Sequence, residues 1–122
     1  MTIREVIQYV DAAKHNTCTR EEKRSWLSRL DQLIHTRIHA NYQGAQGPPP
    51  GYHPDTDMDT ALLLVAPWDE MYLRYLEMQI DYLNGEIDRY NNSAALFDAL
   101  FQGYAAWYHR NHMPKSSSFQ NY

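Results

Sequence analysis

The chain has 122 residues, of which 43% are hydrophobic, and a formal net charge of −4. This length favours one domain with one modest core. Its acidic balance argues against a protein that binds duplex DNA on its own, because phosphate contacts need clustered Lys and Arg and the basic residues here are interleaved with acidic ones.

Cysteine usage and hydropathy indicate a cytosolic setting. Cys18 is the only cysteine, so the sequence predicts no internal disulfide and no oxidising compartment. The longest apolar run, 61–66, is far shorter than the roughly 20 residues of a membrane span, and the first residues lack a signal-peptide pattern. We therefore expect a protein that does not contact a membrane.

Two capping boxes of the S/T-x-x-E type mark helix starts in the first third of the chain. They are Thr2–Glu5 and Thr19–Glu22, and each is followed by apolar residues at helical spacing. These patterns predict helices over 3–14 and 20–40. The short joint at 15–18 predicts a helical hairpin or a sharp bend.

Residues 41–60 contain Gly, Pro and Asp without an apolar period, which predicts a long loop or arm. Three consecutive prolines favour an extended polyproline conformation. A connection of this length in a small domain is typically mobile or engaged in binding. The next run, 61–66, predicts a short extended segment, with the start of a helix as the alternative.

A stripe of large side chains predicts one helix from Pro67 to Asn91. Gly85 interrupts the stripe without changing its phase, and a glycine in a helix costs about 1 kcal/mol relative to Ala, which a well-packed stripe offsets. Asn91 and Asn92 predict a corner after this helix, because Asn tolerates the left-handed conformation at helix ends. The stripe consists of Tyr72, Leu76, Ile80, Leu83, Ile87 and Tyr90.

A fourth helix is predicted over 94–112, with a broad aromatic face and Pro114 just beyond its end. Residues 115–122 are rich in serine, which predicts a tail that is disordered on its own. A binding partner could order this tail through Phe119 and Tyr122. The sequence therefore predicts an all-α, four-helix single domain over 1–114. The aromatic face consists of Phe97, Leu100, Phe101, Tyr104, Trp107 and Tyr108.

The acidic run Asp55, Asp57, Asp59 imitates the start of a calcium-binding loop. Thr60 and Ala66 stand where that loop needs Gly and a bidentate Glu, so we interpret the run as a solvated loop.

Histidine and cysteine spacings give weak signals for chemistry. His109 and His112 are three residues apart on a predicted helix, but no third ligand completes a metal site. His35 and His39 give an equally weak signal, and Cys18 near His15 matches no known thiol-catalysis signature. We predict no catalytic, metal-binding or cofactor-binding residue. A small metal-dependent enzyme built on the late histidines and the acidic loop remains a minor alternative.

Aromatic residues dominate the second half of the chain. Twelve of the 16 Phe, Trp and Tyr residues lie between Trp68 and Tyr122, more than one helix pair can bury. Tyr and Trp are enriched in protein interfaces, so this bias predicts assembly, with a thicker core as the alternative. The predicted interface residues are Tyr52, Trp68, Tyr72, Tyr75, Tyr82, Arg89, Tyr104, Trp107, Tyr108, Phe119 and Tyr122.

A set of short motifs between residues 60 and 114 resembles head-tail connector proteins of tailed bacteriophages and prophages, also called adaptor or head-completion proteins. The resemblance is a pattern of spacings and is weaker over the first two predicted helices. The motifs are Pro67-Trp68-Asp69-Glu70-Met71-Tyr72, Ile80-Asp81, Asn84-Gly85-Glu86, Arg89-Tyr90-Asn91-Asn92, Ala95-Leu96-Phe97 and His112-Met113-Pro114.

The resemblance implies a helical virion protein, present in the host cytoplasm during assembly, that forms a homo-oligomeric ring, expected to be a dodecamer, below the portal protein. Such a ring extends the DNA channel, lets DNA pass without specific binding, and docks a tail-completion or stopper protein. It implies no catalytic residues and no cofactor. On this reading 41–60 and the tail are arms that reach neighbours. The alternative is a helical adaptor or regulatory module that binds one cellular protein.

Overall fold

The computed structural model describes residues 1–115, and the all-α prediction is confirmed. Within this range no strand forms, and extended pairing is limited to two isolated bridges. The helical elements are α1 (Ile3–Ala13), α2 (Arg20–Arg37), the short 3-10 helix η1 (His39–Asn41), α3 (Glu70–Leu83) and α4 (Ile87–Asn111).

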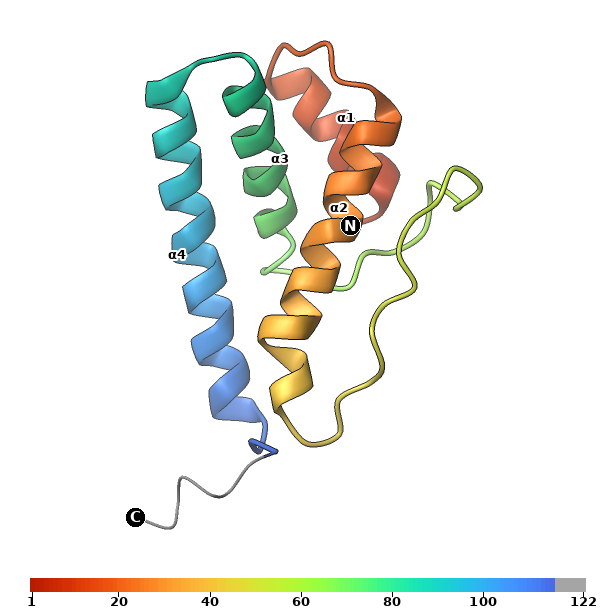
Figure 1. Ribbon diagram of the computed structural model, residues 1–122, viewed down its shortest axis with the longest axis vertical. Coiled ribbons are helices and arrows are strands. Elements are labelled where there is room, and N and C mark those ends of the chain that lie inside the picture. Colours follow the sequence, from red (N-terminus) through yellow and green to blue (C-terminus); the bar gives the residue numbers. More distant parts are fainter. Residues whose placement is uncertain (116–122) are drawn as a thin grey trace.

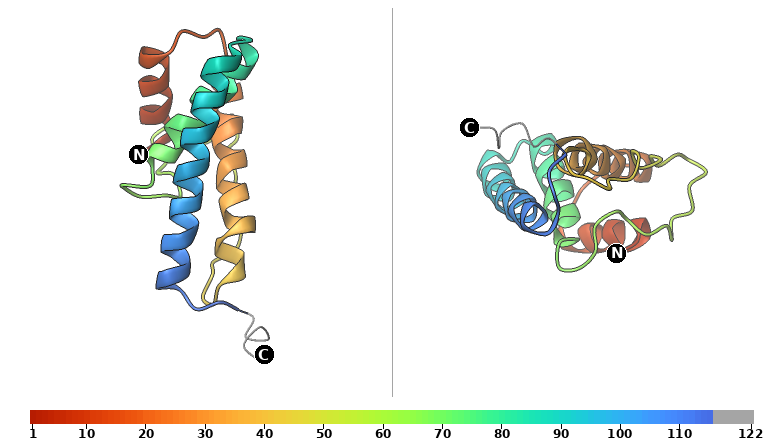
Figure 2. Two further views of the ribbon diagram at one scale, coloured as in Figure 1. Left: turned by 90° about the vertical axis from the view of Figure 1, so that its left-hand side faces the viewer. Right: turned by 90° about the horizontal axis from the view of Figure 1, so that it is seen from below.

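Helix α3 occupies the centre of the molecule (Figures 1 and 2). It packs against α1 and α2 on one side and along α4 on the other, so α4 forms an outer flank of the molecule. In the second half of α4, side chains also reach other segments: Tyr104 bonds His39 of η1, and Trp107 contacts Trp68.

Both predicted capping boxes are present. The Thr2 hydroxyl accepts a hydrogen bond from Glu5 N at 3.2 Å, and the Glu5 carboxylate accepts one from Thr2 N at 2.9 Å. Thr19 and Glu22 repeat this exchange at the start of α2, at 3.1 and 2.9 Å. Each box satisfies backbone donors that the first helical turn leaves unpaired.

The core is built from the apolar stripes of the first three helices, with a smaller contribution from α4. Its central side chains are fully buried, which removes them from water and supplies most of the stabilisation. They are Ile3, Val6 and Val10 of α1, Leu27, Leu30 and Ile34 of α2, and Met71, Tyr72, Leu76 and Ile80 of α3.

The segment 61–66 is extended, as its two-residue alternation of burial shows. Leu62 and Leu64 are buried, whereas Leu63 and Val65 are exposed. Ala61 forms a single antiparallel bridge with Thr2, so the segment adds no strand to a sheet.

The long connection before α3 lies on the chain's own helices. Gln32 Nε2 donates to Pro49 O at 2.7 Å, and Ser28 Oγ accepts from Tyr52 N at 3.1 Å, which fixes the connection to α2. Further along, Arg4 N of α1 donates to Met58 O at 2.8 Å. The prediction of a long loop is confirmed, and its backbone is bound to α1 and α2 within the same chain.

The prediction of one helix through Gly85 is wrong. Helix α3 ends at Leu83, and Gly85 has a φ of 70°, in the left-handed region that favours glycine. The stripe kept its phase because the short break between α3 and α4 leaves Ile87 at a spacing that also fits a continuous helix. Leu83 and Ile87 are nevertheless exposed, so Ile80 is the last residue of the stripe that is buried in the core.

The predicted corner at Asn91 and Asn92 is also wrong. Both residues lie in the second turn of α4 and are exposed. Asn has only a modest preference against helix interiors, and tertiary context overrides it here. The reversal that these residues were expected to provide occurs six residues earlier, at Gly85.

Candidate functional site

The turn between α3 and α4 is closed by two backbone hydrogen bonds that need a left-handed residue. Gly85 N donates to Tyr82 O at 3.1 Å, and Glu86 N donates to Asp81 O at 3.0 Å. This paired arrangement, with glycine just beyond the last helical residue, is a common way to end a helix. It reverses the chain in a few residues and places α4 beside α3.

A buried carboxylate holds the turn in place from beneath. Asp81 is fully buried and accepts hydrogen bonds from Lys14 Nζ at 2.7 Å and from Ser93 Oγ at 2.8 Å. Lys14 follows α1 and Ser93 belongs to α4, so one side chain of α3 joins three helices. Because the ion pair and the hydroxyl satisfy Asp81, the turn has a rigid base.

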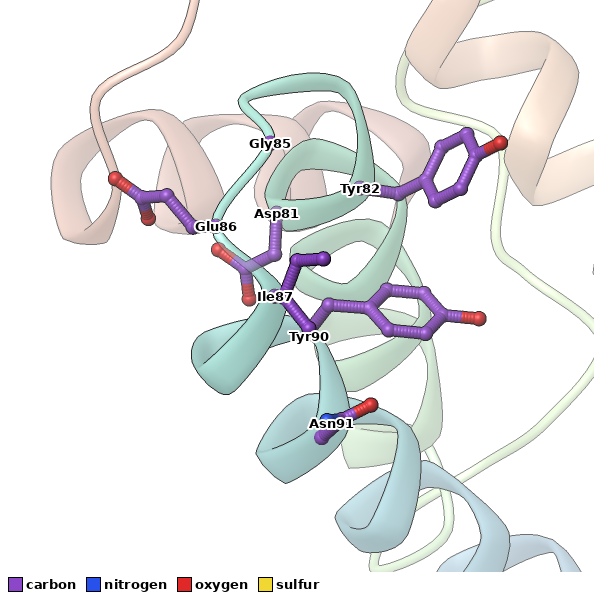
Figure 3. A pocket seen from close by; sticks show the side chains of 7 residues that line it. All are labelled: Asp81, Tyr82, Gly85, Glu86, Ile87, Tyr90 and Asn91. Atoms are coloured by element: carbon purple, nitrogen blue, oxygen red, sulfur yellow. The ribbon is translucent and has the colours of Figure 1, made fainter.

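Above this base lies an apolar pocket of about 300 Å³ (Figure 3). The rings of Tyr82 and Tyr90 extend in the same direction, with centroids 5.7 Å apart, and both residues line the pocket. Tyr82 is 68% exposed and Ile87 is 69% exposed. The residues that line the pocket are Asp81, Tyr82, Gly85, Glu86, Ile87, Tyr90 and Asn91.

Leu83, next to Tyr82 in the last turn of α3, is also 55% exposed. We call the surface formed by Tyr82, Leu83, Ile87 and Tyr90 the tip. Large apolar side chains that gather at one exposed point of a small domain are typical of interaction sites. The tip lies at one end of the elongated molecule, and the described chain leaves α4 at the other end (Figure 1).

The structure places the predicted interface residues in different environments. Tyr72, Tyr75 and Tyr104 are buried and belong to the core, so they offer no free surface to a partner. Phe119 and Tyr122 lie outside the described residues. Tyr82, Arg89 and Trp107 are exposed, whereas Tyr52, Trp68 and Tyr108 are half-buried.

Sequence reasoning missed three residues of the tip, Leu83 at the end of α3 and Ile87 and Tyr90 at the start of α4. All three were assigned to one continuous helical stripe, which hid them as candidates. The signal that could have revealed them is Gly85, because a glycine that ends α3 takes the residues on either side of it out of one continuous stripe.

A second cavity, of about 500 Å³, lies where the ends of α2 and α4 meet the long connection. His39 Nε2 lies 2.6 Å from the Tyr104 hydroxyl, and the His39 ring stacks on Tyr108 with centroids 4.5 Å apart. The cavity is walled largely by the chain's own 44–50 segment. It is therefore a less open surface than the tip.

Burial keeps the His39 ring of this second cavity uncharged. It lowers the pKa of His39 to about 4, and the neighbouring His35 and His112 act in the same direction. His39 is therefore neutral at pH 7 and acts as a hydrogen-bond partner rather than a cation. The Tyr42 hydroxyl lies 3.0 Å from His109 Nδ1. This contact joins the last turns of α4 to the segment that follows α2.

Across residues 1–115, no three His, Cys, Asp or Glu side chains are grouped closely enough to hold a metal ion. None of the helices described for this range has the length and apolar character needed to cross a bilayer. Comparison with protein-family models, with curated proteins and with solved structures finds no match to this chain.

Proposed function

We propose that this protein is a structural subunit of a tailed-phage head-tail connector, which assembles as a ring on the portal and uses its tip as a docking surface. The observation that carries the proposal is the exposed apolar tip on a rigid turn. Tyr82 and Ile87 expose about two thirds of their side chains there. An apolar surface of this kind is stabilised when a partner covers it.

The shape of the subunit supports the same proposal. The tip stands at one end of an elongated helical molecule (Figure 1). If copies stand side by side with the same orientation, all their tips line one rim of the ring. A rim of apolar pockets suits a flat contact with another ring, where each pocket accepts one large side chain.

The motifs that resemble connector proteins include the residues that build the turn. Asn84-Gly85-Glu86 forms the end of α3, and Asp81 anchors it to Lys14 and Ser93. These motifs therefore have a structural explanation as the frame of the tip. The virion role itself comes from the resemblance and is tested by experiment.

The test is binding to purified rings of a portal protein from the genome that carries this gene. We expect the wild-type chain to cosediment with the portal, and the Tyr82→Ser, Ile87→Ser double variant to lose at least tenfold in affinity, as truncation of two buried anchors implies. Tyr9→Ser is the matched control, because Tyr9 is 54% exposed on α1 and is not one of the residues that form the tip. Equal binding of the double variant and the wild type excludes the tip as the docking surface.

A further inference from the structure

The end of the molecule opposite the tip is basic, although the whole chain has a net charge of −4. The last turns of α2 and α4 lie side by side there, together with η1 (Figures 1 and 2). The two stretches of sequence that build this end, 35–50 and 104–115, contain no Asp or Glu. Their cations are Arg37, Arg110 and Lys115, all exposed. We call the surface around these three residues the basic end.

Hydrogen bonds hold the three cations at one place. Asn41 Nδ2 donates to Arg37 O at 2.9 Å, and Lys115 N donates to Asn41 O at 2.9 Å. The chain that follows α4 is therefore fixed to the chain that follows α2. Arg110 lies in the last turn of α4, shortly before Lys115.

The basic end has no carboxylate of its own to neutralise it. None of its three cations forms a salt bridge within residues 1–115, whereas other cations of the chain do, such as Lys14 with Asp81 and Arg4 with Asp59. A helix dipole favours a cation in the last turn of a helix. That effect accounts for a basic residue at each helix end but not for the lack of every carboxylate.

The cavity of about 500 Å³ lies at the basic end, and none of the residues that line it is a Lys, Arg, Asp or Glu. Leu63, Tyr108 and the three prolines of 48–50 give its walls a largely apolar character. His39 adds no charge at pH 7, because burial lowers its pKa to about 4. A cavity of this volume with apolar walls is typical of a ligand pocket. An uncharged cavity thus lies beside a group of unpaired cations.

We propose that the basic end binds an acidic peptide segment of a partner protein. One large apolar side chain of the segment enters the cavity, and its carboxylates pair with Arg37, Arg110 and Lys115. The guanidinium group of Arg matches a carboxylate with two parallel hydrogen bonds, so the partner supplies the charges that this end lacks. The apolar side chain displaces water from Leu63 and Tyr108, which favours binding.

Nucleic acid is the other polyanion that this charge attracts, and the aromatic rings at the cavity disfavour it. Tyr108 stacks on His39 with ring centroids 4.5 Å apart and on His112 with ring centroids 3.6 Å apart. Tyr108 therefore has both faces covered, whereas single-stranded nucleic acid binds by stacking its bases on free aromatic faces. A peptide needs no such face.

A short peptide tests the charge and the cavity separately. The probe is a fluorescein-labelled peptide with blocked ends, Asp-Glu-Phe-Glu-Asp, and its binding is measured by fluorescence anisotropy. We expect it to bind about tenfold more tightly than the neutral Asn-Gln-Phe-Gln-Asn, and less tightly as the salt concentration rises. We also expect it to bind about threefold more tightly than Asp-Glu-Ser-Glu-Asp, which has no side chain to fill the cavity. Equal binding in either comparison overturns the proposal.

Charge reversal locates the binding surface. The Arg37→Glu, Arg110→Glu variant is expected to bind the Phe peptide about tenfold more weakly than the wild type. Arg20→Glu, Arg29→Glu is the matched control, because it changes the charge equally at two exposed positions of α2, and it is expected to bind normally. The milder Arg37→Gln, Arg110→Gln variant is expected to lose about threefold, and circular dichroism checks that all variants are folded. An equal loss in the control variant means that the attraction is not specific to the basic end and overturns the proposal.

A second pair of variants tests the cavity without changing any charge. Leu63→Ser removes an apolar wall and is expected to weaken binding of the Phe peptide about threefold. Val65→Ser is the control, because Val65 is 71% exposed on the same extended segment but does not line the cavity. Normal binding by Leu63→Ser, or an equal loss in both variants, contradicts the assigned role of the cavity.

The remaining probe separates the two classes of polyanion. A labelled thymidine oligonucleotide with the same number of charges is expected to bind more weakly than the Phe peptide, and tighter binding by the oligonucleotide overturns the choice of a peptide. None of these measurements needs a portal protein. A chain that binds the portal but not the acidic peptide therefore overturns this inference alone and leaves the proposed function standing.

Discussion

The hydroxyl of Tyr72 donates a hydrogen bond of 2.6 Å to Oδ1 of Asp31, which joins α3 to α2 inside the core. The same hydroxyl accepts a hydrogen bond from Leu64 N at 2.8 Å, and Tyr52 also donates to Asp31. One buried carboxylate therefore fastens α3 and two points of the long connection to α2.

Loss of the Tyr72 hydroxyl is expected to destabilise the fold. Tyr72→Phe leaves Leu64 N buried without an acceptor and removes one donor from Asp31, so the free energy of unfolding falls by about 1–3 kcal/mol. Urea denaturation measures the change. Tyr75→Phe is the control, because Tyr75 is buried but its hydroxyl has no hydrogen bond among the described residues, and a loss as large there contradicts the assigned role.

Asp31 gives the stability a specific pH dependence. Burial raises the pKa of its carboxyl above the ordinary value of 3.8, although hydrogen bonds from Tyr52 and Tyr72 act in the opposite direction. The folded state then holds a proton that the unfolded state releases, so this contribution is complete below pH 3.8 and is lost as the pH rises through the folded pKa.

The Asp31→Asn variant isolates that contribution, because it cannot titrate at this position. We expect the free energy of unfolding of the wild type, relative to the variant, to fall as the pH rises above 3.8 and then to level off. Denaturation at a series of pH values measures the difference. A wild type that gains stability relative to the variant over this range has the opposite sign and rules out the account.

Removal of the Lys14 ammonium is expected to weaken the base of the tip. Lys14→Met leaves the fully buried Asp81 with Ser93 as its remaining partner, which costs roughly 3 kcal/mol because an unpaired charge stays in the interior. Adding Asp81→Asn removes that charge and is expected to recover part of the loss. If both variants are equally unstable, the ion pair is not what anchors the turn.

Gly85 is expected to be more sensitive to substitution than another open glycine. Gly85→Ala forces a side chain into a φ of 70° and costs roughly 1–2 kcal/mol, since no atom lies near enough to compensate or to clash. Gly47→Ala has equally open space but no positive φ, so its thermal midpoint is expected to stay unchanged. Equal effects at both positions contradict the left-handed assignment.

The sequence predicted the features whose causes are local. Thr2 and Thr19 start helices because each capping box satisfies backbone donors within four residues. The long connection was predicted from the glycines and prolines of 41–60, which cannot sustain a helical pattern. The alternation at 61–66 follows from an extended backbone with one buried face.

The features that the sequence did not reveal depend on contacts between distant residues. The period of the stripe through Gly85 was compatible with a continuous helix, and the bonds from Lys14 and Ser93 to Asp81 that fix the break come from other helices. Tyr72 was expected at an interface because ring size alone does not distinguish a core residue from a contact residue. Its hydrogen bond to Asp31 makes it part of the interior.

We propose that the chain assembles as a ring on the portal through its tip. The most direct measurement is the mass of the complex formed when excess chain is added to purified portal rings. A connector is expected to add about twelve subunits to each portal ring, and the Tyr82→Ser, Ile87→Ser variant is expected to add none. A complex with only one or two copies, or no complex at any concentration, contradicts the account.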